Sequence, residues 1–187
     1  MPQPTTGSYV SFHPGVAMRL ALALFFSVSI LALSPPALAD GENAGDFTLP
    51  SLNGDNVSLS DYLGNKVVLV SFFATWCAPC IKEMAKLNVM QEELADRGLQ
   101  VLSISVDEAR DKAKVKSLIK RIRYQPPVLL DADSKVINTY NPRKDMPWTM
   151  IIGLDKKIHH KKKGFTEGDE EKLRKWVEAL LQPAAPE

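Results

Sequence analysis

The only two cysteines of the chain, Cys77 and Cys80, lie two residues apart in the stretch SFFATWCAPCIKEM. An apolar run precedes them, and a segment with helical spacing of apolar residues follows. A strand ending before this pair would hold Cys77 at the start of a helix. There the free backbone N–H groups and the helix dipole stabilise a thiolate. Cys80, one helical turn later, could then close a small disulfide ring with Cys77.

Three kinds of chemistry suit such a pair: redox exchange, metal binding and a structural disulfide. A tightly held metal needs about four ligands, but the chain has no second cysteine pair, and the adjacent His159 and His160 would point to opposite sides of a strand. A structural disulfide closing so small a ring would gain little loop entropy. We therefore favour redox chemistry, with Cys77 as the exposed nucleophile and Cys80 as the shielded partner that resolves the mixed disulfide.

The residues between the cysteines, Ala78 and Pro79, carry no charge. Nothing there supplies a cation that would lower the pKa of the Cys77 thiol. The lack of charge between the cysteines therefore favours a moderate or reducing pair over a strongly oxidising one.

The composition is that of one soluble domain with appendages. The chain has 187 residues, of which 45% are hydrophobic and 24% charged, and its net charge is +1. This balance predicts an ordinary hydrophobic core and gives no electrostatic reason to expect a nucleic-acid partner. With two cysteines the chain is not a disulfide-stapled scaffold.

The N-terminal region has the pattern of a secretory signal. Met18-Arg19 provides a short positive start, Leu20–Leu33 is apolar, and Ala37-Leu38-Ala39 offers a small-residue cleavage site. The apolar run is shorter than the roughly 18 residues that span a bilayer, although an uncleaved anchor is the alternative. Either way we expect a bacterial protein in the periplasm or otherwise outside the cytoplasm. The expected division is residues 1–39 as an N-terminal extension with signal peptide or anchor, residues 40–182 as the folded domain, and residues 183–187 as a disordered tail.

The rest of the chain alternates strand and helix patterns. The β-branched run from Val67 to Ala74 predicts a strand buried on both faces, and the segment after Pro79 predicts an amphipathic helix ending near Gly98. A lysine-rich stretch from Ile158 to Phe165 is expected as the edge of a hairpin, where lysines deter sheet pairing. Other expected elements are a hairpin of Phe47–Leu49 and Val57–Leu59, strands at 99–107, 128–130 and 149–155, and helices at 115–122, within 131–141 and at 173–181. Helices between strands favour parallel pairing, so the order predicts a three-layer α/β sandwich.

The segments FFATWCAPC, Lys82-Glu83 and Met146-Pro147-Trp148-Thr149 resemble the thioredoxin superfamily. Within that superfamily they are similar to the extracytoplasmic TlpA/ResA-like thiol–disulfide oxidoreductases, and the segment AGDFTLPSLNGDNVSLSDYLGNKVVLV matches the same branch. The resemblance covers about residues 44 to 181. It implies a thioredoxin-like three-layer sandwich, with a central mixed sheet, helices on both faces and an N-terminal β-hairpin extension.

The resemblance also implies substrate-binding residues around the disulfide. Trp76 would shield one side of it, although a half-buried core aromatic is the alternative. Pro147 falls where the family keeps a cis-proline, and Met146 before it would pair with the substrate backbone. Trp148, next to Pro147, could line a substrate groove.

Two positions concern proton handling. Thioredoxins carry a buried aspartate six residues before the first cysteine, and here that position is Ser71. Glu83 lies where the ResA-like branch has an active-site glutamate, one helical turn after Cys80. A partly buried Glu83 with a raised pKa could exchange protons during disulfide exchange. The alternative is a solvated helix charge, as expected for Lys82 and Lys86.

The function expected from these residues is a protein disulfide reductase, with Cys77, Cys80 and Glu83 as catalytic residues and with no cofactor and no metal. Its partners would be disulfide-containing proteins and a membrane thiol electron donor, and cytochrome c maturation is a frequent role in the family. Contact with a membrane would come only through an uncleaved anchor. The alternatives are a thioredoxin-fold metal-binding, copper-handling protein and a chaperone module. A peroxidase is disfavoured, because the Thr-x-x-Cys of thioredoxin-fold peroxidases is missing.

Overall fold

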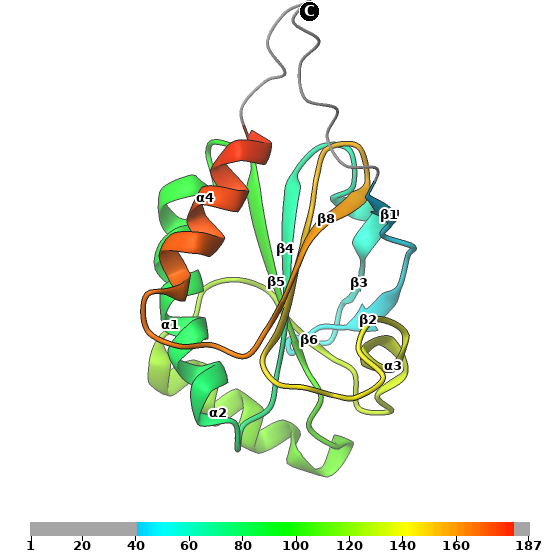
Figure 1. Cartoon of the computed structure of the whole chain (residues 1–187). Helices are drawn as coiled ribbons and strands as arrows, with labels where there is room; N and C mark the ends of the chain where they lie inside the picture. Colours follow the sequence, from blue (N-terminus) through cyan, green and yellow to red (C-terminus); the bar gives the residue numbers. More distant parts are fainter. Residues whose placement is uncertain (1–40, 182–187) are drawn as a thin grey trace, which may run out of the picture. The chain divides into compact units, whose positions relative to one another are not determined.

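The computed structural model describes residues 41–181, so the expected signal peptide and the expected tail lie outside the described residues. The described part is built on a six-stranded sheet of order β1-β8-β7-β4-β5-β6 (Figure 1). The strands are β1 Glu42–Asn43, β2 Thr48–Pro50, β3 Asn56–Ser58, β4 Val67–Phe73, β5 Leu99–Ser105, β6 Val128–Leu130, β7 Trp148–Ile152 and β8 Lys157–Lys163. The helices are α1 Ala78–Leu94, α2 Lys112–Ile122, α3 Lys135–Tyr140 and α4 Asp169–Leu181, with short 3-10 turns at Leu59–Asp61 and Ala109–Asp111.

Strand β4 lies inside the sheet, and all seven of its residues are buried. It runs parallel to β5 and antiparallel to β7, while β6 continues the parallel side and β8 the antiparallel side. The continuous apolar run therefore marked a strand covered on both faces, as predicted. The mixed sheet predicted from the element order is confirmed.

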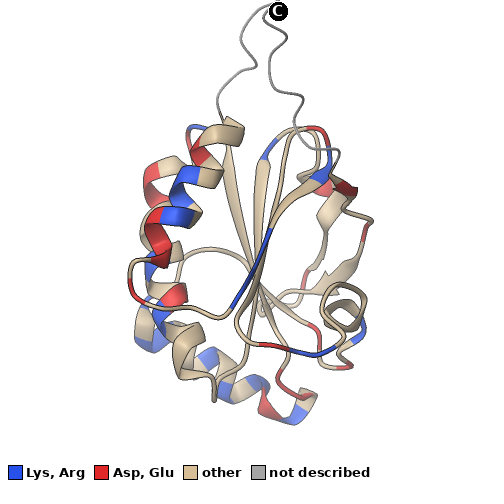
Figure 2. Cartoon of the chain, viewed as in Figure 1, with Lys and Arg blue, Asp and Glu red and all other residues tan. Residues whose placement is uncertain are grey.

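The helices cover both faces of the sheet, as predicted. Apolar residues of α1, α2 and α4 pack on one face, whereas α3 and the β2–β3 hairpin pack on the other (Figure 1). Charged residues lie mainly on the helices and the loops, and the inner strands β4, β5 and β7 carry none; β8 is the basic exception (Figure 2). No helix within residues 41–181 is long and apolar enough to cross a bilayer.

The predicted N-terminal hairpin is confirmed as a separate two-stranded antiparallel sheet, in which Leu49 faces Val57. Leu49 then packs into the cluster of apolar residues on the α3 side of the main sheet. This contact attaches the hairpin to the sheet that carries the cysteine segment.

The prediction that the lysine-rich strand β8 forms a free sheet edge is wrong at its start. Strand β1, which the sequence did not indicate, pairs antiparallel with β8 through Glu42 and Asn43, opposite Ile158 and Lys157. A strand of two residues has no readable periodicity, because period-2 alternation needs about four residues to be recognised.

Candidate active site

The cysteine pair lies where strand β4 passes into helix α1, as predicted. Cys77 is the N-cap residue of α1, and its Sγ accepts a hydrogen bond of 3.3 Å from the backbone N–H of Cys80. The two cysteines are joined by a disulfide, with Cα atoms 5.3 Å apart. Pro79 suits the first turn of the helix, because the N–H that proline lacks has no partner there. The sulfur atoms therefore sit at the positive end of the helix dipole.

The two cysteines differ less in exposure than predicted. Cys77 is only 5% exposed and Cys80 is 0% exposed, so Cys80 is shielded as predicted, while the expectation of an exposed Cys77 is wrong. Both sulfur-bearing residues belong to a buried cluster with Phe73, Ala74 and Met84. The small exposed fraction of the pair therefore belongs to Cys77.

Trp76, directly before Cys77, is 75% exposed. The alternative reading of a half-buried core aromatic is therefore wrong. A large exposed aromatic beside a nearly buried disulfide offers apolar surface to a partner, because aromatic residues supply large contact area in interfaces.

A buried carboxylate fixes the loop that leads to the cysteines. Asp107, after strand β5, accepts hydrogen bonds from the backbone N–H of Thr75 at 3.0 Å and from its hydroxyl at 2.7 Å. The Oδ2 atom of Asp107, which accepts the Thr75 N–H, also accepts a hydrogen bond of 2.8 Å from the Ser105 hydroxyl. Sequence reasoning missed this contact, although an aspartate directly after an apolar strand was its one visible signal.

Glu83 is 0% exposed, although it carries a carboxyl group. Its Oε2 accepts a hydrogen bond of 2.7 Å from the Ser71 hydroxyl, and its Oε1 accepts one of 2.8 Å from the Thr149 hydroxyl. The expectation of a partly buried Glu83 understated the burial, and the alternative of a solvated helix charge is wrong. The carboxyl group that thioredoxins place on the strand thus comes here from the helix, and Ser71 serves as its hydrogen-bond donor.

Burial raises the pKa of Glu83, because the charged carboxylate is disfavoured away from water; the hydroxyls of Ser71 and Thr149 and the positive charge of Lys162 oppose this effect. The direction is the one predicted from the sequence. Glu83 lies one helical turn after Cys80 on the same buried side of α1, and residues three apart on a helix are neighbours. A protonatable group is therefore available to the shielded thiol.

The partners of Glu83 belong to a row of polar residues across the sheet. In the strand register Ser103 of β5 lies opposite Ser71 of β4, Ser71 opposite Thr149 of β7, and Thr149 opposite Lys162 of β8. The hydroxyl of Tyr124 shares a hydrogen bond of 2.6 Å with Ser103 at one end of the row. Sequence reasoning missed this row. Its visible signal was Ser71 and Thr149, each a single polar residue in an otherwise apolar strand, but only the register aligns the row.

The peptide bond between Met146 and Pro147 is cis, as predicted. Pro147 is buried, and Met146 packs against the cluster that contains Cys77 and Cys80. Trp148 is half-buried and packs against the cluster on the α3 side of the sheet. The structure therefore brings Met146 close to the cysteines, whereas Trp148 lies among residues of the other face.

The two adjacent histidines contact different partners. His159 lies 2.9 Å from Asp155, and His160 stacks on Trp176 with ring centroids 4.3 Å apart. Within residues 41–181, no group of three or more histidine, cysteine, aspartate or glutamate side chains comes together to hold a metal ion.

Known proteins are similar to this chain in sequence and in fold. Residues 41–161 match the AhpC/TSA family. The chain is 30% identical to thiol-disulfide oxidoreductase ResA of Bacillus cereus over 146 residues, which cover 78% of this chain and 79% of that one. A putative thiol:disulfide interchange protein DsbE from Chlorobium tepidum has a similar structure, with a TM-score of 0.71 and 29% identity over 78% of this chain and all of that one. A putative protein disulfide isomerase from Bacteroides thetaiotaomicron has a TM-score of 0.68 and 28% identity, covering 75% and 89%.

This disulfide lies at a helix N-terminus, with Cys77 slightly exposed and with the protonatable Glu83 one helical turn after Cys80. Such a disulfide can accept and release two electrons by exchange with another dithiol. From this geometry and these relatives, the chain belongs to the AhpC/TSA family and is a thiol–disulfide oxidoreductase of the ResA-like group.

Proposed function

We propose that this oxidoreductase works outside the cytoplasm of a bacterium as a reductant of protein disulfides. The observation that carries the direction is the charge next to the pair: Ala78 and Pro79 are uncharged, Lys82 is exposed to solvent, and the buried titratable group one turn away is the carboxyl of Glu83. Strongly oxidising pairs owe their potential to a stabilised nucleophilic thiolate. A carboxyl group close to the sulfurs disfavours a thiolate, and so favours a reducing pair.

The reaction begins with the dithiol form. The Cys77 thiolate attacks one sulfur of a substrate disulfide, forms a mixed disulfide and releases the other substrate sulfur as a thiolate. Cys80 then loses its proton and attacks the Cys77 sulfur, which releases the second substrate thiolate. The substrate gains two electrons, and the protein is left with the Cys77–Cys80 disulfide.

Glu83 supplies the proton acceptor in the second step. A general base is most effective when its pKa lies near the operating pH, and burial moves the pKa of Glu83 upward, in that direction. The carboxylate takes the proton of Cys80 as this thiol attacks Cys77. When the disulfide is reduced again by a donor, the same group returns the proton.

Substrate approaches across Trp76 and the Met146–Pro147 segment. Trp76 precedes Cys77 in the sequence and is exposed, and Met146 packs against the cluster that contains both cysteines. A shallow groove of about 280 Å³ lies beside the pair. Its walls are Ala78, Pro79, Lys82, Phe165, Thr166 and Glu167. An extended segment of a substrate protein could lie in this groove, with its cystine over Cys77.

The partners follow from this direction of electron flow. After each turnover the Cys77–Cys80 disulfide has to be reduced again. We propose a membrane protein with a reactive dithiol as the electron donor for this step. Proteins with disulfides are the substrates, and oxidised apocytochromes c are the first to test, because cytochrome c maturation is the family role noted above.

The test is the equilibrium of the Cys77–Cys80 pair against a graded series of reduced and oxidised glutathione or dithiothreitol. We expect a potential near that of thioredoxin, about −270 mV, or lower. A potential near about −120 mV, as in strong oxidants, would reverse the direction proposed.

The order of attack has its own test. The Cys80→Ser variant should accumulate mixed disulfides with substrate, because the resolving thiol is missing, while the matched Cys77→Ser variant should trap none. Equal trapping by both variants would contradict the assignment of Cys77 as the nucleophile.

A further inference from the structure

A buried lysine lies at the end of the polar row, and nothing in the disulfide exchange itself requires it. The side chain of Lys162 is only 10% exposed. Its ammonium group lies 2.7 Å from Oδ2 of Asp169 and donates a hydrogen bond to the carbonyl oxygen of Gly164. Lysine is rarely buried unless its charge is paired, so the burial of this ion pair at the end of the polar row needs an explanation.

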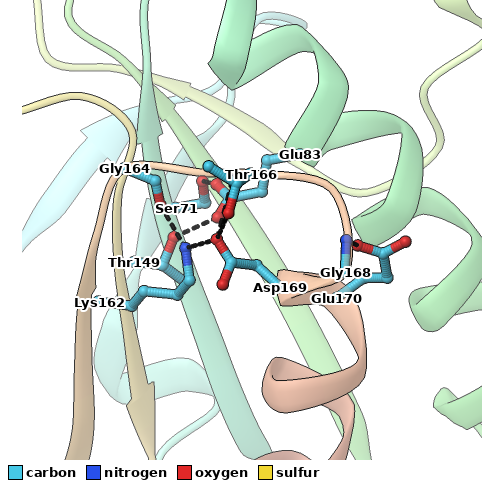
Figure 3. A network of polar contacts seen from close by, with 9 residues as sticks. All are labelled: Ser71, Glu83, Thr149, Lys162, Gly164, Thr166, Gly168, Asp169 and Glu170. Atoms are coloured by element: carbon cyan, nitrogen blue, oxygen red, sulfur yellow. Dashed lines mark hydrogen bonds and ion pairs between the residues drawn. The ribbon is translucent and has the colours of Figure 1, made fainter.

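The location of Lys162 provides an explanation for its burial. Lys162 lies opposite Thr149 in the β7–β8 register, and Thr149 donates a hydrogen bond to the Glu83 carboxyl. Figure 3 shows the Lys162 ammonium beside Thr149, which contacts Glu83, and beside the Asp169 carboxylate, which it contacts. The positive charge is thus one strand away from the buried carboxyl group.

We propose that Lys162 and Asp169 are positioning residues that set the protonation of Glu83. Lys162 holds a positive charge in the interior that favours the carboxylate form. Asp169 fixes that charge in place and offsets part of it. This inference rests on the proposed role of Glu83 as the proton acceptor of Cys80.

Asp169 is itself held in a fixed geometry. Its Oδ2 accepts hydrogen bonds from the backbone N–H of Thr166 at 2.8 Å and from the Thr166 hydroxyl at 2.9 Å. The ammonium of Lys162 and, after it, these bonds from Thr166 lower the pKa of Asp169 to about 2, so Asp169 stays ionised wherever Glu83 titrates. The pair therefore places two charges of opposite sign near Glu83.

The two charges have opposite effects on Glu83. Burial has the largest effect and raises the pKa of the Glu83 carboxyl; Lys162 opposes this effect by lowering that pKa, whereas Asp169 adds to it. Thr166 also lines the groove beside the cysteines, so the same contacts tie the wall of that groove to the buried charge. A partner that moves this wall would move the charge as well.

Other charged groups face Glu83 less directly. On α1 the disulfide does not titrate, while Lys82 and Lys86 are exposed, and Lys86 pairs with Glu170 of α4 at 2.8 Å. Strands β4 and β7 contribute only the hydroxyls of Ser71 and Thr149. Tyr124, at the far end of the row, is buried, and burial raises its pKa, so it stays neutral where Glu83 titrates. Within the described residues, Lys162 and Asp169 are therefore the charged groups placed to tune Glu83.

The experiment is a titration of Glu83 in the full chain in its disulfide form, where neither cysteine titrates. The carboxyl carbon NMR shift of Glu83, assigned by its loss in Glu83→Gln, gives the midpoint. We expect the midpoint to rise in Lys162→Met, to fall in Asp169→Asn, and to stay near that of the unchanged protein in Lys162→Arg. The double variant Lys162→Met/Asp169→Asn should fall between the two single variants.

A purely structural ion pair would behave differently. Breaking it from either side would loosen the same contact, and both single variants would shift the midpoint in the same direction or leave it unchanged; either result overturns the proposal. Lys161→Met is the matched control, because Lys161 is the neighbour of Lys162 on β8 and pairs with Glu42 on strand β1 instead. Its midpoint should not move.

The exchange reaction separates this inference from the role of Glu83. If the midpoints move in opposite directions while Glu83→Gln exchanges disulfides with an unchanged pH profile, the inference on Lys162 stands and the catalytic role of Glu83 fails. If the profile depends on Glu83 but the two midpoints do not separate, the role of Glu83 stands and the inference fails.

Discussion

The two faces of the central sheet are built from the same strands, but only the α1 side carries the row of polar residues. On the α3 side, β4 presents Val70 and Phe72 to an uninterrupted apolar cluster. On the α1 side, the residue between them, Ser71, donates a hydrogen bond to Glu83. Ser103 lies between Leu102 and Ile104 in the same way on β5. Successive residues of a strand point to opposite faces, so each strand contributes both to a plain core and to a polar row.

The difference separates what holds the fold from what serves the chemistry. An apolar face stabilises the protein by removing apolar surface from water and by close packing. A buried carboxyl group lowers stability unless it is hydrogen-bonded or stays protonated. On the α1 face such a group, Glu83, is bonded to hydroxyls of the sheet one helical turn from Cys80. On the α3 side the buried carboxyl group of Asp131 instead accepts backbone N–H groups of α3.

The largest expected effect comes from breaking the apolar face. Phe72→Ala should lower the free energy of unfolding by about 3–5 kcal/mol, because it removes a fully buried aromatic and leaves a cavity. The pH profile of disulfide exchange by the folded protein should be unchanged. Denaturant unfolding and an exchange assay on the same sample measure both, and a shifted profile would show that the two faces are not separable.

Next in size is the pH dependence of stability caused by Glu83. Its pKa is raised above the usual 4.5, so the folded protein binds this proton more tightly than the unfolded chain. The contribution is therefore fully present below pH 4.5 and is lost as the pH rises through the folded pKa. Glu83→Gln has nearly the same volume and no charge, so its stability relative to the unchanged protein should increase over this range.

Unfolding of both proteins in the disulfide form, at a series of pH values, measures this difference. A difference that is constant with pH would contradict the raised pKa. Phe72→Ala serves as the control, because its loss of stability should not depend on pH.

A smaller effect is expected from Thr149→Val, which removes one hydrogen bond to Glu83 and keeps the shape of the side chain. The loss of stability should be about 1.5–3 kcal/mol when Glu83 is ionised and about 0.5–1.5 kcal/mol when it is protonated, since hydrogen bonds to charged groups are the stronger ones. The same unfolding series measures it. An equal loss at both ends of the pH range would indicate that Glu83 does not ionise in the folded protein.

The smallest effect should come from Lys161→Met. Lys161 forms a surface ion pair with Glu42, and such pairs contribute about 0–1 kcal/mol. The change in unfolding free energy should be within this range and should shrink as salt is added. A larger loss would mean that strand β1 depends on this pair for its attachment to β8.

Much of the frame could be predicted from local pattern. The apolar run of β4, the helical spacing after Pro79 and the turn residues of the N-terminal hairpin each predicted an element that the structure contains. The position of Cys77 at the helix start followed from the same patterns. These features depend on residues close together in the sequence.

What could not be predicted depends on register and on contacts distant in sequence. Ser103, Ser71, Thr149 and Lys162 are separated along the chain, and only the pairing of four strands aligns them. Lys162 was grouped with the lysines of a solvated edge, since local pattern does not show which lysine of a run turns inward. The exposure of Trp76 and the near-burial of Cys77 also depend on neighbours from other elements.

The most direct test of the central claim is the rate at which the dithiol form reduces a model disulfide, followed as a function of pH in the unchanged protein and in Glu83→Gln. If the polar row holds Glu83 for proton transfer, the unchanged protein shows an inflection that Glu83→Gln lacks, and the variant is slower by about 10²-fold where Glu83 is ionised. Two profiles that superimpose would contradict the claim, because the buried carboxyl group would then take no part in the exchange.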